Sequence, residues 1–204
     1  MQEVAEYRQL NQVFTDLAEY HSMTFTLLGA KLPEWVSTGV VSANFFDVLG
    51  VKPVLGRLIT PADETPKAEP VLVLSYAYWV KNFGRDPKIL GRTFEMNDRV
   101  HTVVGVLPPL PEYPDANDVY MPTTSCPFRS SPKMIADGDM RMVTVFARMK
   151  PEVTEARAQS DLATITNRLA LTYPKSYPGA AGVLAKVTGL EHELTHAARP
   201  RLAS

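Results

Sequence analysis

The chain has 204 residues, a length that fits one large domain or two small ones. Hydrophobic residues make up 45% of it and charged residues 21%, a composition that excludes a wholly disordered chain. Its 21 Lys and Arg against 22 Asp and Glu leave a net charge of −1, so it lacks the cationic excess of a nucleic-acid-binding surface.

The first elements expected along the chain are a helix and two strands. Apolar side chains recur at spacings of three and four in the first segment, which predicts an amphipathic helix over Tyr7, Leu10, Phe14 and Leu17. Residues 23–27 alternate apolar side chains with threonines, the period of a half-buried strand, and residues 36–40 predict a second strand.

A short helix and a polar loop are expected next. Ser42 can cap a helix through the residues that follow it, and Gly50 stands where a glycine commonly ends one. Residues 60–70 hold three prolines and three acidic side chains, which predicts a solvated loop and a subdomain boundary.

The middle of the chain predicts a buried strand, a helix and a hairpin. Residues 71–74 are a continuous apolar run, typical of a strand buried on both faces. Ser75 is expected to cap a helix that stops at Gly84. Asn97-Asp98 predicts the turn of a hairpin, because Asn and Asp tolerate a positive φ.

The last part of the chain predicts a loop, a strand and a long helix. Residues 107–114 contain four prolines, which excludes a central strand, whereas residues 141–150 have a strong strand pattern. Thr154 is expected to cap a helix that ends at Tyr173 and has the core face Ala158, Leu162, Ile165 and Leu169. Strands and helices without regular βαβ alternation indicate an α+β fold.

One motif has the form of a zinc site, His-Glu-Leu-Thr-His at residues 192–196. On a helix the two histidines face the same side and can share a zinc, with Glu193 as general base. A catalytic zinc needs a third protein ligand, and residues 197–204 contain no His, Asp, Glu or Cys, so only an upstream ligand is open. We interpret the motif as a solvated terminal helix without stoichiometric zinc. A zinc hydrolase through His192, Glu193 and His196 is an alternative.

Other catalytic and nucleotide-binding motifs fail on spacing. Residues 50–57 and 84–92 end in Gly-Arg, but five and six residues separate their glycines where a phosphate loop has four, so turn-forming glycines are expected. Neither Ser42 nor Ser75 lies in a nucleophile motif. Four aromatic residues are expected in the core, namely Trp35, Phe45, Phe46 and Trp79. Composition and spacing thus predict an α+β module that is not an enzyme and needs no cofactor.

Disulfide, export and membrane signals are not found in the sequence. Cys126 is the single cysteine, so no intramolecular disulfide is expected. The longest stretch without charge or His, residues 35–46, is far shorter than the ~20 apolar residues that span a bilayer. The acidic first residues differ from a signal peptide. We expect a soluble polypeptide, which is also compatible with a piece of a longer membrane protein.

Five blocks of sequence follow one another between residues 41 and 122: 41–57 (VSANFFDVLGVKPVLGR), 70–76 (PVLVLSY), 83–92 (FGRDPKILGR), 103–108 (VVGVLP) and 118–122 (DVYMP). With the strand and helix expected over residues 145–162, they resemble the MacB-like periplasmic core domain of ABC permeases in the FtsX/MacB superfamily. The resemblance covers most of residues 7–175.

The resemblance implies a domain outside the bacterial inner membrane, on its periplasmic face, between the first and second transmembrane helices of a permease. It also implies a two-part module. Residues 1–60 and 141–204 would form a porter-like subdomain that leads to a transmembrane helix absent from this chain, and residues 61–140 an inserted distal subdomain.

The function that the resemblance implies is non-enzymatic, coupling cytoplasmic ATP hydrolysis to export or force transmission. The implied partners are an ABC ATPase domain or subunit, a second permease copy and a periplasmic adaptor, with no nucleic acid and no metal. An extracytoplasmic sensor of a small ligand is the alternative. The isolated chain is expected to be mainly monomeric, because little of the natural interface would remain.

A partner contact is expected in the proline-rich residues 108–114. Pro111, Glu112 and Tyr113 are the candidate contact residues, because prolines keep a loop ordered and Tyr is suited to interfaces. A rigid connector is the alternative.

Overall fold

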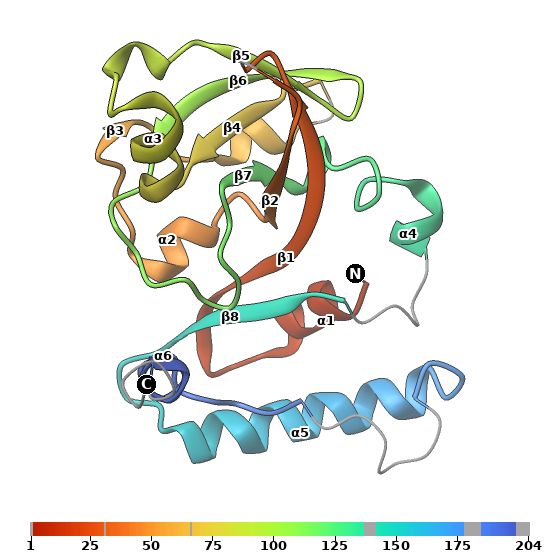
Figure 1. Cartoon of the computed structure of the whole chain (residues 1–204). Helices are drawn as coiled ribbons and strands as arrows, with labels where there is room; N and C mark the ends of the chain where they lie inside the picture. Colours follow the sequence, from red (N-terminus) through yellow and green to blue (C-terminus); the bar gives the residue numbers. More distant parts are fainter. Residues whose placement is uncertain (1, 31, 66, 137–141, 178–184, 199–204) are drawn as a thin grey trace. The chain divides into compact units, whose positions relative to one another are not determined.

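The computed structural model describes residues 2–30, 32–65, 67–136, 142–177 and 185–198 (Figure 1). The chain divides into two compact units: unit 1 comprises Met1–Asp16 and Ala147–Ser204, and unit 2 comprises Leu17–Phe146. Helices and a mixed parallel and antiparallel sheet confirm the α+β prediction. The expected porter-like and distal subdomains, with boundaries near residues 60 and 140, stay a prediction.

The strands of unit 2 pair in a closed ring, β1-β2-β7-β4-β6-β5 and back to β1. The pairs β2–β7 and β4–β6 are parallel, and the other pairs in the ring are antiparallel. The bounds are β1 Phe14–Leu28, β2 Glu34–Val41, β4 Val71–Leu74, β5 Thr93–Met96, β6 Arg99–Val106 and β7 Val119–Pro122. A ring without an open edge protects these strands from pairing with other chains.

Strand β4 lies between the two hydrophobic clusters of unit 2. Its residues are fully or almost fully buried and alternate between the clusters, which confirms the predicted strand buried on both faces. Leu72 and Leu74 belong to a cluster with Phe94 from β5. Val71 and Val73 belong to the other, which includes Phe46.

Two short helices of unit 2 cover these clusters. Ser75 is the N-cap of helix α3 (Tyr76–Phe83), and its hydroxyl accepts a hydrogen bond from the Tyr78 N–H at 3.2 Å. Gly84, with φ 57°, is the C-cap of this helix. Both predictions for this helix are confirmed. Helix α2 (Phe45–Leu49) ends as predicted at Gly50, with φ 71°.

The predicted cap at Ser42 is wrong. Asn44 occupies the N-cap position of α2 and makes no side-chain cap bond. The Ser42 hydroxyl instead accepts the Glu19 N–H at 2.9 Å and donates to Asn44 Oδ1 at 2.7 Å. The Ser42 hydroxyl therefore forms a hydrogen bond with strand β1 and does not cap the helix.

One of the four aromatic residues expected in the core lies on the surface. Phe45, Phe46 and Trp79 are buried, but the Trp35 side chain is 82% exposed. Trp35 precedes Val36, which is fully buried on β2, and successive side chains of a strand face opposite sides. The alternation therefore turns the indole outward.

Unit 1 contains α1 (Gln2–Leu10), the start of β1, the end of β8 (Thr144–Met149), α5 (Glu155–Thr172) and α6 (Leu190–Ala198). As predicted, Thr154 caps α5, accepting the Arg157 N–H at 3.3 Å, and Tyr173 follows its last residue. The predicted first helix is correct only to Leu10. Phe14 and Leu17 lie on β1, at the place where the chain passes from unit 1 to unit 2. The buried side chains of β1 do not alternate regularly there, so the spacing of three between Phe14 and Leu17 resembles that of a helix.

The remaining elements are short. The predicted hairpin turn between β5 and β6 is confirmed at Asn97 and Asp98, with φ 56° and 57°. Residue 141 of the expected strand 141–150 lies outside the described residues. The other bounds are β3 Leu55–Gly56, α4 Pro132–Ala136 and the 3-10 helices η1 Pro61–Glu64, η2 Pro87–Ile89 and η3 Thr123–Ser125.

Candidate functional site

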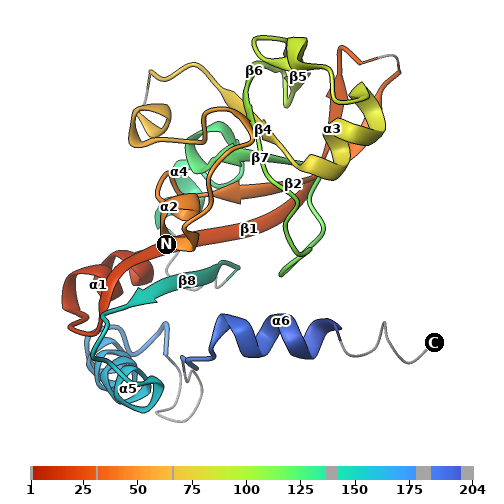
Figure 2. The same ribbon diagram turned by 90° about the vertical axis from the view of Figure 1, so that its left-hand side faces the viewer.

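The predicted contact loop connects β6 to β7 and has no helix or strand between residues 107 and 118. Figures 1 and 2 show this green segment leaving the sheet as a long excursion before it returns to β7. At its start the Leu107 N–H donates to the Leu74 carbonyl at 2.9 Å, and the Leu107 side chain is buried. The loop therefore begins at a fixed point on the central strand.

The three predicted contact residues differ in exposure. Pro111 and Glu112 are exposed, whereas Tyr113 is half-buried and its ring packs edge-on against Phe146, with centroids 6.2 Å apart. The neighbouring Leu110 is 42% exposed. Leu110 is therefore an exposed apolar side chain of this loop that sequence reasoning missed, whereas Tyr113 packs against the fold.

A buried polar network holds the end of the loop. The hydroxyl of Tyr20 on β1 donates to Asp115 Oδ2 at 3.1 Å and accepts a bond from the Asn117 side-chain amide at 2.5 Å. The Ser37 N–H on β2 donates to Asp118 Oδ2 at 2.9 Å. Burial raises the pKa of the Tyr20 hydroxyl, so it stays a neutral donor. Both ends of the loop are thus tied to strands of unit 2.

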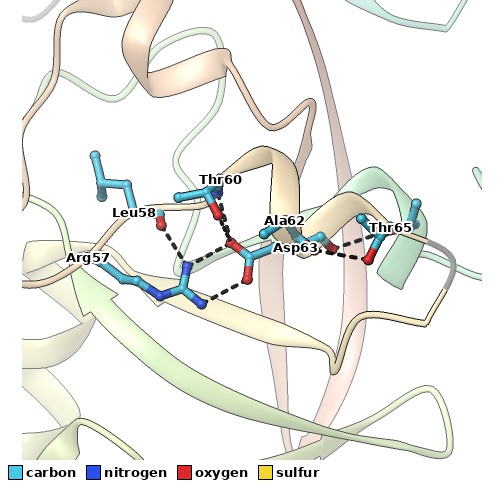
Figure 3. Close-up of polar contacts among 7 residues, drawn as sticks. Arg57, Leu58, Thr60, Ala62, Asp63 and Thr65 are labelled. Carbon is cyan, nitrogen blue, oxygen red and sulfur yellow. Dashed lines mark hydrogen bonds and ion pairs between the residues drawn. The ribbon is translucent and has the colours of Figure 1, made fainter.

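A second polar cluster stabilises the segment after β3 (Figure 3). Two guanidinium nitrogens of Arg57 contact the Asp63 carboxylate at 2.7 and 2.8 Å, and the Thr60 N–H and hydroxyl donate to it at 2.8 Å each. Burial alone would raise the pKa of Asp63, but these bonds outweigh it and lower that pKa. The cluster fixes the start of η1.

Two glycines from different sequence blocks lie opposite each other where β3 pairs with β6. Gly56 and Gly105 are register partners, and a Cβ on Gly105 would stand 1.9 Å from the Arg57 carbonyl oxygen. A Cβ on Gly56, which has φ 69°, would stand 2.2 Å from the Val104 oxygen. Gly56, at the end of the stretch 50–57, therefore allows a close backbone contact with β6.

A fully buried arginine was missed by sequence reasoning. Arg129 is 0% exposed, and its guanidinium contacts Glu19 on β1 at 2.6 Å. The residue lies in a Pro-Phe-Arg-Ser segment without periodicity, so no sequence pattern indicated its burial. The ion pair joins β1 to the chain that follows β7.

The His-Glu-Leu-Thr-His motif lies on α6, where His192 is exposed and Glu193 is half-buried. The side chain of His196 is outside the described residues. Within the part of the chain that the structure describes, no three His, Cys, Asp or Glu side chains gather closely enough to hold a metal ion.

We expect the tag-free chain to hold far less than one zinc atom per molecule, because a protein zinc site needs three or four ligands. Elemental analysis after dialysis measures this directly. Full occupancy that is lost when His192 and His196 are both changed to Ala would contradict the expectation and restore the hydrolase alternative. A polyhistidine tag must be removed first, since it binds metal itself.

His101 is a fully buried histidine on β6. Its Nδ1 lies 2.9 Å from the Arg99 carbonyl, and its Nε2 has no hydrogen-bond partner among the described residues. Burial, the largest influence, lowers the pKa of the ring. His101 is therefore still neutral in the folded state at a pH where the same imidazole is already protonated in the unfolded chain.

Acid should destabilise the fold through His101. The pKa of His101 in the folded state is below the ordinary 6.5. The stability that the neutral ring contributes to the free energy of unfolding is therefore fully present above pH 6.5 and is lost as the pH falls below that value. We expect a lower urea midpoint at pH 5.5 than at pH 7.5, and a smaller difference in His101→Leu. Burial also lowers the pKa of His21, which leaves part of the dependence in the variant. Equal differences in the two proteins would contradict this role of His101.

The residues assembled in the structure define an α+β domain with a closed ring of strands, in which buried hydrogen bonds and an ion pair join distant segments. The chain belongs to the MacB-like periplasmic core domain family, whose family model matches residues 2–165. It is the periplasmic domain of a MacB/FtsX-like ABC permease.

Solved structures with the same fold include two extracytoplasmic domains. The periplasmic region of MacB from Actinobacillus actinomycetemcomitans is 20% identical, with a TM-score of 0.63 over 84% of this chain and 74% of that one. The extracellular domain of the noncanonical ABC-type transporter YknZ from Gram-positive bacteria is 13% identical, with a TM-score of 0.62 over 85% and 83%. No curated protein matches the sequence.

Among the described residues, no helix combines the length and apolar character that crossing a bilayer requires.

Proposed function

We propose that this domain works outside the bacterial inner membrane and couples ATP hydrolysis by a cytoplasmic ABC ATPase to export or to force transmission. The domain itself is non-enzymatic, and its role is mechanical. Family membership supports the location, and the construction of unit 1 supports the mechanical role.

The observation that carries the proposal is that α5 binds two segments far apart in the chain. On one side, the Tyr7 hydroxyl of α1 is 2.9 Å from the Thr166 hydroxyl in a buried contact. On the other, the Gln159 side-chain amide donates to the Ala185 carbonyl and accepts the Val187 N–H, both at 2.8 Å. A displacement of either segment is therefore transmitted to the other through α5.

A distance measurement in the full-length permease tests the coupling. Leu171 on α5 is 86% exposed and suits a spin label as Leu171→Cys, while Cys126 is fully buried. We expect a defined distance between labels on two permease copies in membrane vesicles, and a change in it when the ATPase turns over. A hydrolysis-deficient ATPase is the control. An unchanged distance during turnover would contradict coupling, and a missing distance would contradict the two-copy assembly.

The partners in the proposal are the ATPase, the second permease copy and a periplasmic adaptor. We propose the loop of residues 108–114 as a contact, with Pro111 and Glu112 at its exposed surface and Tyr113 holding its shape. The porter-like and distal subdomains, with their boundaries near residues 60 and 140, are part of the same proposal.

The isolated chain should be mainly monomeric, because small polar interfaces bind weakly without the rest of the assembly. Light scattering at micromolar concentration should give a mass close to 22.6 kDa. A stable dimer at that concentration would contradict this prediction.

A further inference from the structure

We propose that residues 81–92 of unit 2 form a basic docking surface for an acidic segment of another protein, with Arg85 and Arg92 as the side chains that bind its carboxylates. The inference goes beyond the proposed function and does not require it. Neither the loop of residues 108–114 nor the coupling through α5 belongs to this surface.

Positive charge is concentrated in this short stretch. Residues 81–92 contain four cationic side chains and one acidic side chain, although the whole chain has a net charge of −1. The carboxylate of Asp86 accepts the Lys88 backbone N–H at 2.9 Å and caps η2. All four cations are exposed, namely Lys81, Arg85, Lys88 and Arg92. The stretch therefore presents an excess of positive charge to solvent.

The four cations are not engaged elsewhere in the fold. Within the part of the chain that the structure describes, none of them forms an ion pair or a side-chain hydrogen bond. Arg57, by contrast, is paired with Asp63. An acidic partner would therefore meet cationic groups without first breaking an internal ion pair, and opposite charges favour that encounter.

Aromatic rings hold the two guanidinium groups in place. The guanidinium carbon of Arg85 lies 5.3 Å from the centroid of the Tyr76 ring. That of Arg92 lies 5.3 Å from the Phe83 centroid and 5.7 Å from the Phe94 centroid. These cation–π contacts restrain side chains that are otherwise flexible. Less side-chain entropy is therefore lost when a carboxylate binds.

The backbone turns Arg85 back towards α3. Gly84 and Arg85 have φ values of 57° and 64°, a left-handed conformation that is uncommon for a residue with a side chain. The Arg85 N–H donates to the Trp79 carbonyl at 3.4 Å, and the Trp79 indole N–H donates to the Asp86 carbonyl at 3.0 Å. These bonds fix the backbone from which the arginine reaches the Tyr76 ring.

Both arginines are held against the same helix. Tyr76 is the first residue of α3 and Phe83 the last, and the helix is only eight residues long. Figures 1 and 2 show α3 on the outside of the strands of unit 2. One short extended segment of a partner can therefore reach both guanidinium groups.

The composition of the surface favours a protein segment over a membrane. Peripheral membrane binding combines buried apolar area with attraction to anionic lipids. None of the exposed side chains in residues 81–92 is a large hydrophobic one, so the surface has no apolar anchor. A guanidinium group can donate two parallel N–H groups to one carboxylate. A segment rich in Asp and Glu therefore matches both the charge and the geometry of these arginines.

Binding of a fluorescent oligoglutamate peptide to the full chain, measured by fluorescence anisotropy, tests the surface. We expect saturable binding that weakens as salt is added, because the contacts join exposed charges. Arg85→Gln combined with Arg92→Gln should weaken binding by about tenfold. An oligoglutamine peptide should not bind. Absence of oligoglutamate binding, or binding that the two substitutions leave unchanged, would overturn the proposal.

A charge-matched control separates this surface from the net charge of the chain. Lys52→Gln combined with Lys67→Gln removes two cations from exposed positions of unit 2 outside residues 81–92. It should change the affinity by less than about twofold. A loss equal to that of the arginine variant would overturn the proposal, because net charge alone would then explain binding. Circular dichroism establishes that each variant is folded.

Two further measurements test the stacked arginines and the class of partner. Arg85→Lys combined with Arg92→Lys keeps the charge but lacks the planar donor group, and it should weaken binding by about threefold. Unchanged affinity would overturn recognition by the stacked guanidinium groups. Binding to phosphatidylglycerol vesicles that depends on the two arginines, without binding to oligoglutamate, would replace the acidic segment by a lipid surface and overturn the proposal.

Discussion

Arg129→Met should lower the free energy of unfolding by about 3–5 kcal/mol, because it leaves the Glu19 carboxylate without its buried counter-charge. The Arg129 side chain is 0% exposed and that of Glu19 is 13% exposed, so water cannot replace the lost partner at low cost. Urea denaturation followed by circular dichroism measures the loss.

Two further variants show whether the pairing causes the loss. Arg129→Met combined with Glu19→Met removes both charges and should recover much of the stability, since an apolar pair of similar volume is tolerated in a core. Arg57→Met breaks an ion pair whose arginine is 48% exposed, and it should cost only about 1 kcal/mol. A loss below about 1 kcal/mol for Arg129→Met would show that the buried pair does not stabilise the fold.

Gly105→Ala should be comparably destabilising, by about 3–5 kcal/mol, although it adds a single methyl group. The new Cβ would stand 1.9 Å from the Arg57 oxygen and 2.8 Å from its carbonyl carbon, which are backbone atoms that cannot rotate away. Strands β3 and β6 would have to separate. The thermal midpoint should fall accordingly.

Gly91→Ala is the matched control for this substitution. Gly91 has φ 78°, but nothing lies within 4 Å of a Cβ placed there. Its cost should be only the conformational one, about 1–2 kcal/mol. If Gly105→Ala costs no more than Gly91→Ala, the close approach of the two strands does not limit this position.

Local signals in the sequence predicted local structure well. Ser75, Gly84, Thr154 and the Asn97-Asp98 turn act through bonds or torsions within a few residues, and each was confirmed. The ordered blocks also predicted the family. The error at Ser42 arose because its hydroxyl serves Glu19, 23 residues away, and not the adjacent helix.

Contacts between distant segments could not be predicted. Arg129 and Glu19 are 110 residues apart, and their pairing depends on the path of the chain between them. Tyr113 packs against Phe146, which is 33 residues further along the chain, whereas Leu110 in the same proline-rich loop is 42% exposed. The irregular proline-rich connection was thus predicted from sequence, its role as a partner contact stays a prediction, and the exposure of its side chains required the fold.

The parallel pairing of β2 with β7 sets the order in which unit 2 can be completed during synthesis. Thr38 on β2 pairs with Val119 on β7, so β2 is made long before its neighbour exists. β1 can form its hairpin with β2 at once, because their contacts are close in sequence. The other edge of β2 then remains open until residues 119–122 arrive, and pairing over so long a separation is slow. An emerging chain therefore exposes a strand edge that slower growth at low temperature, or a chaperone, would protect from aggregation.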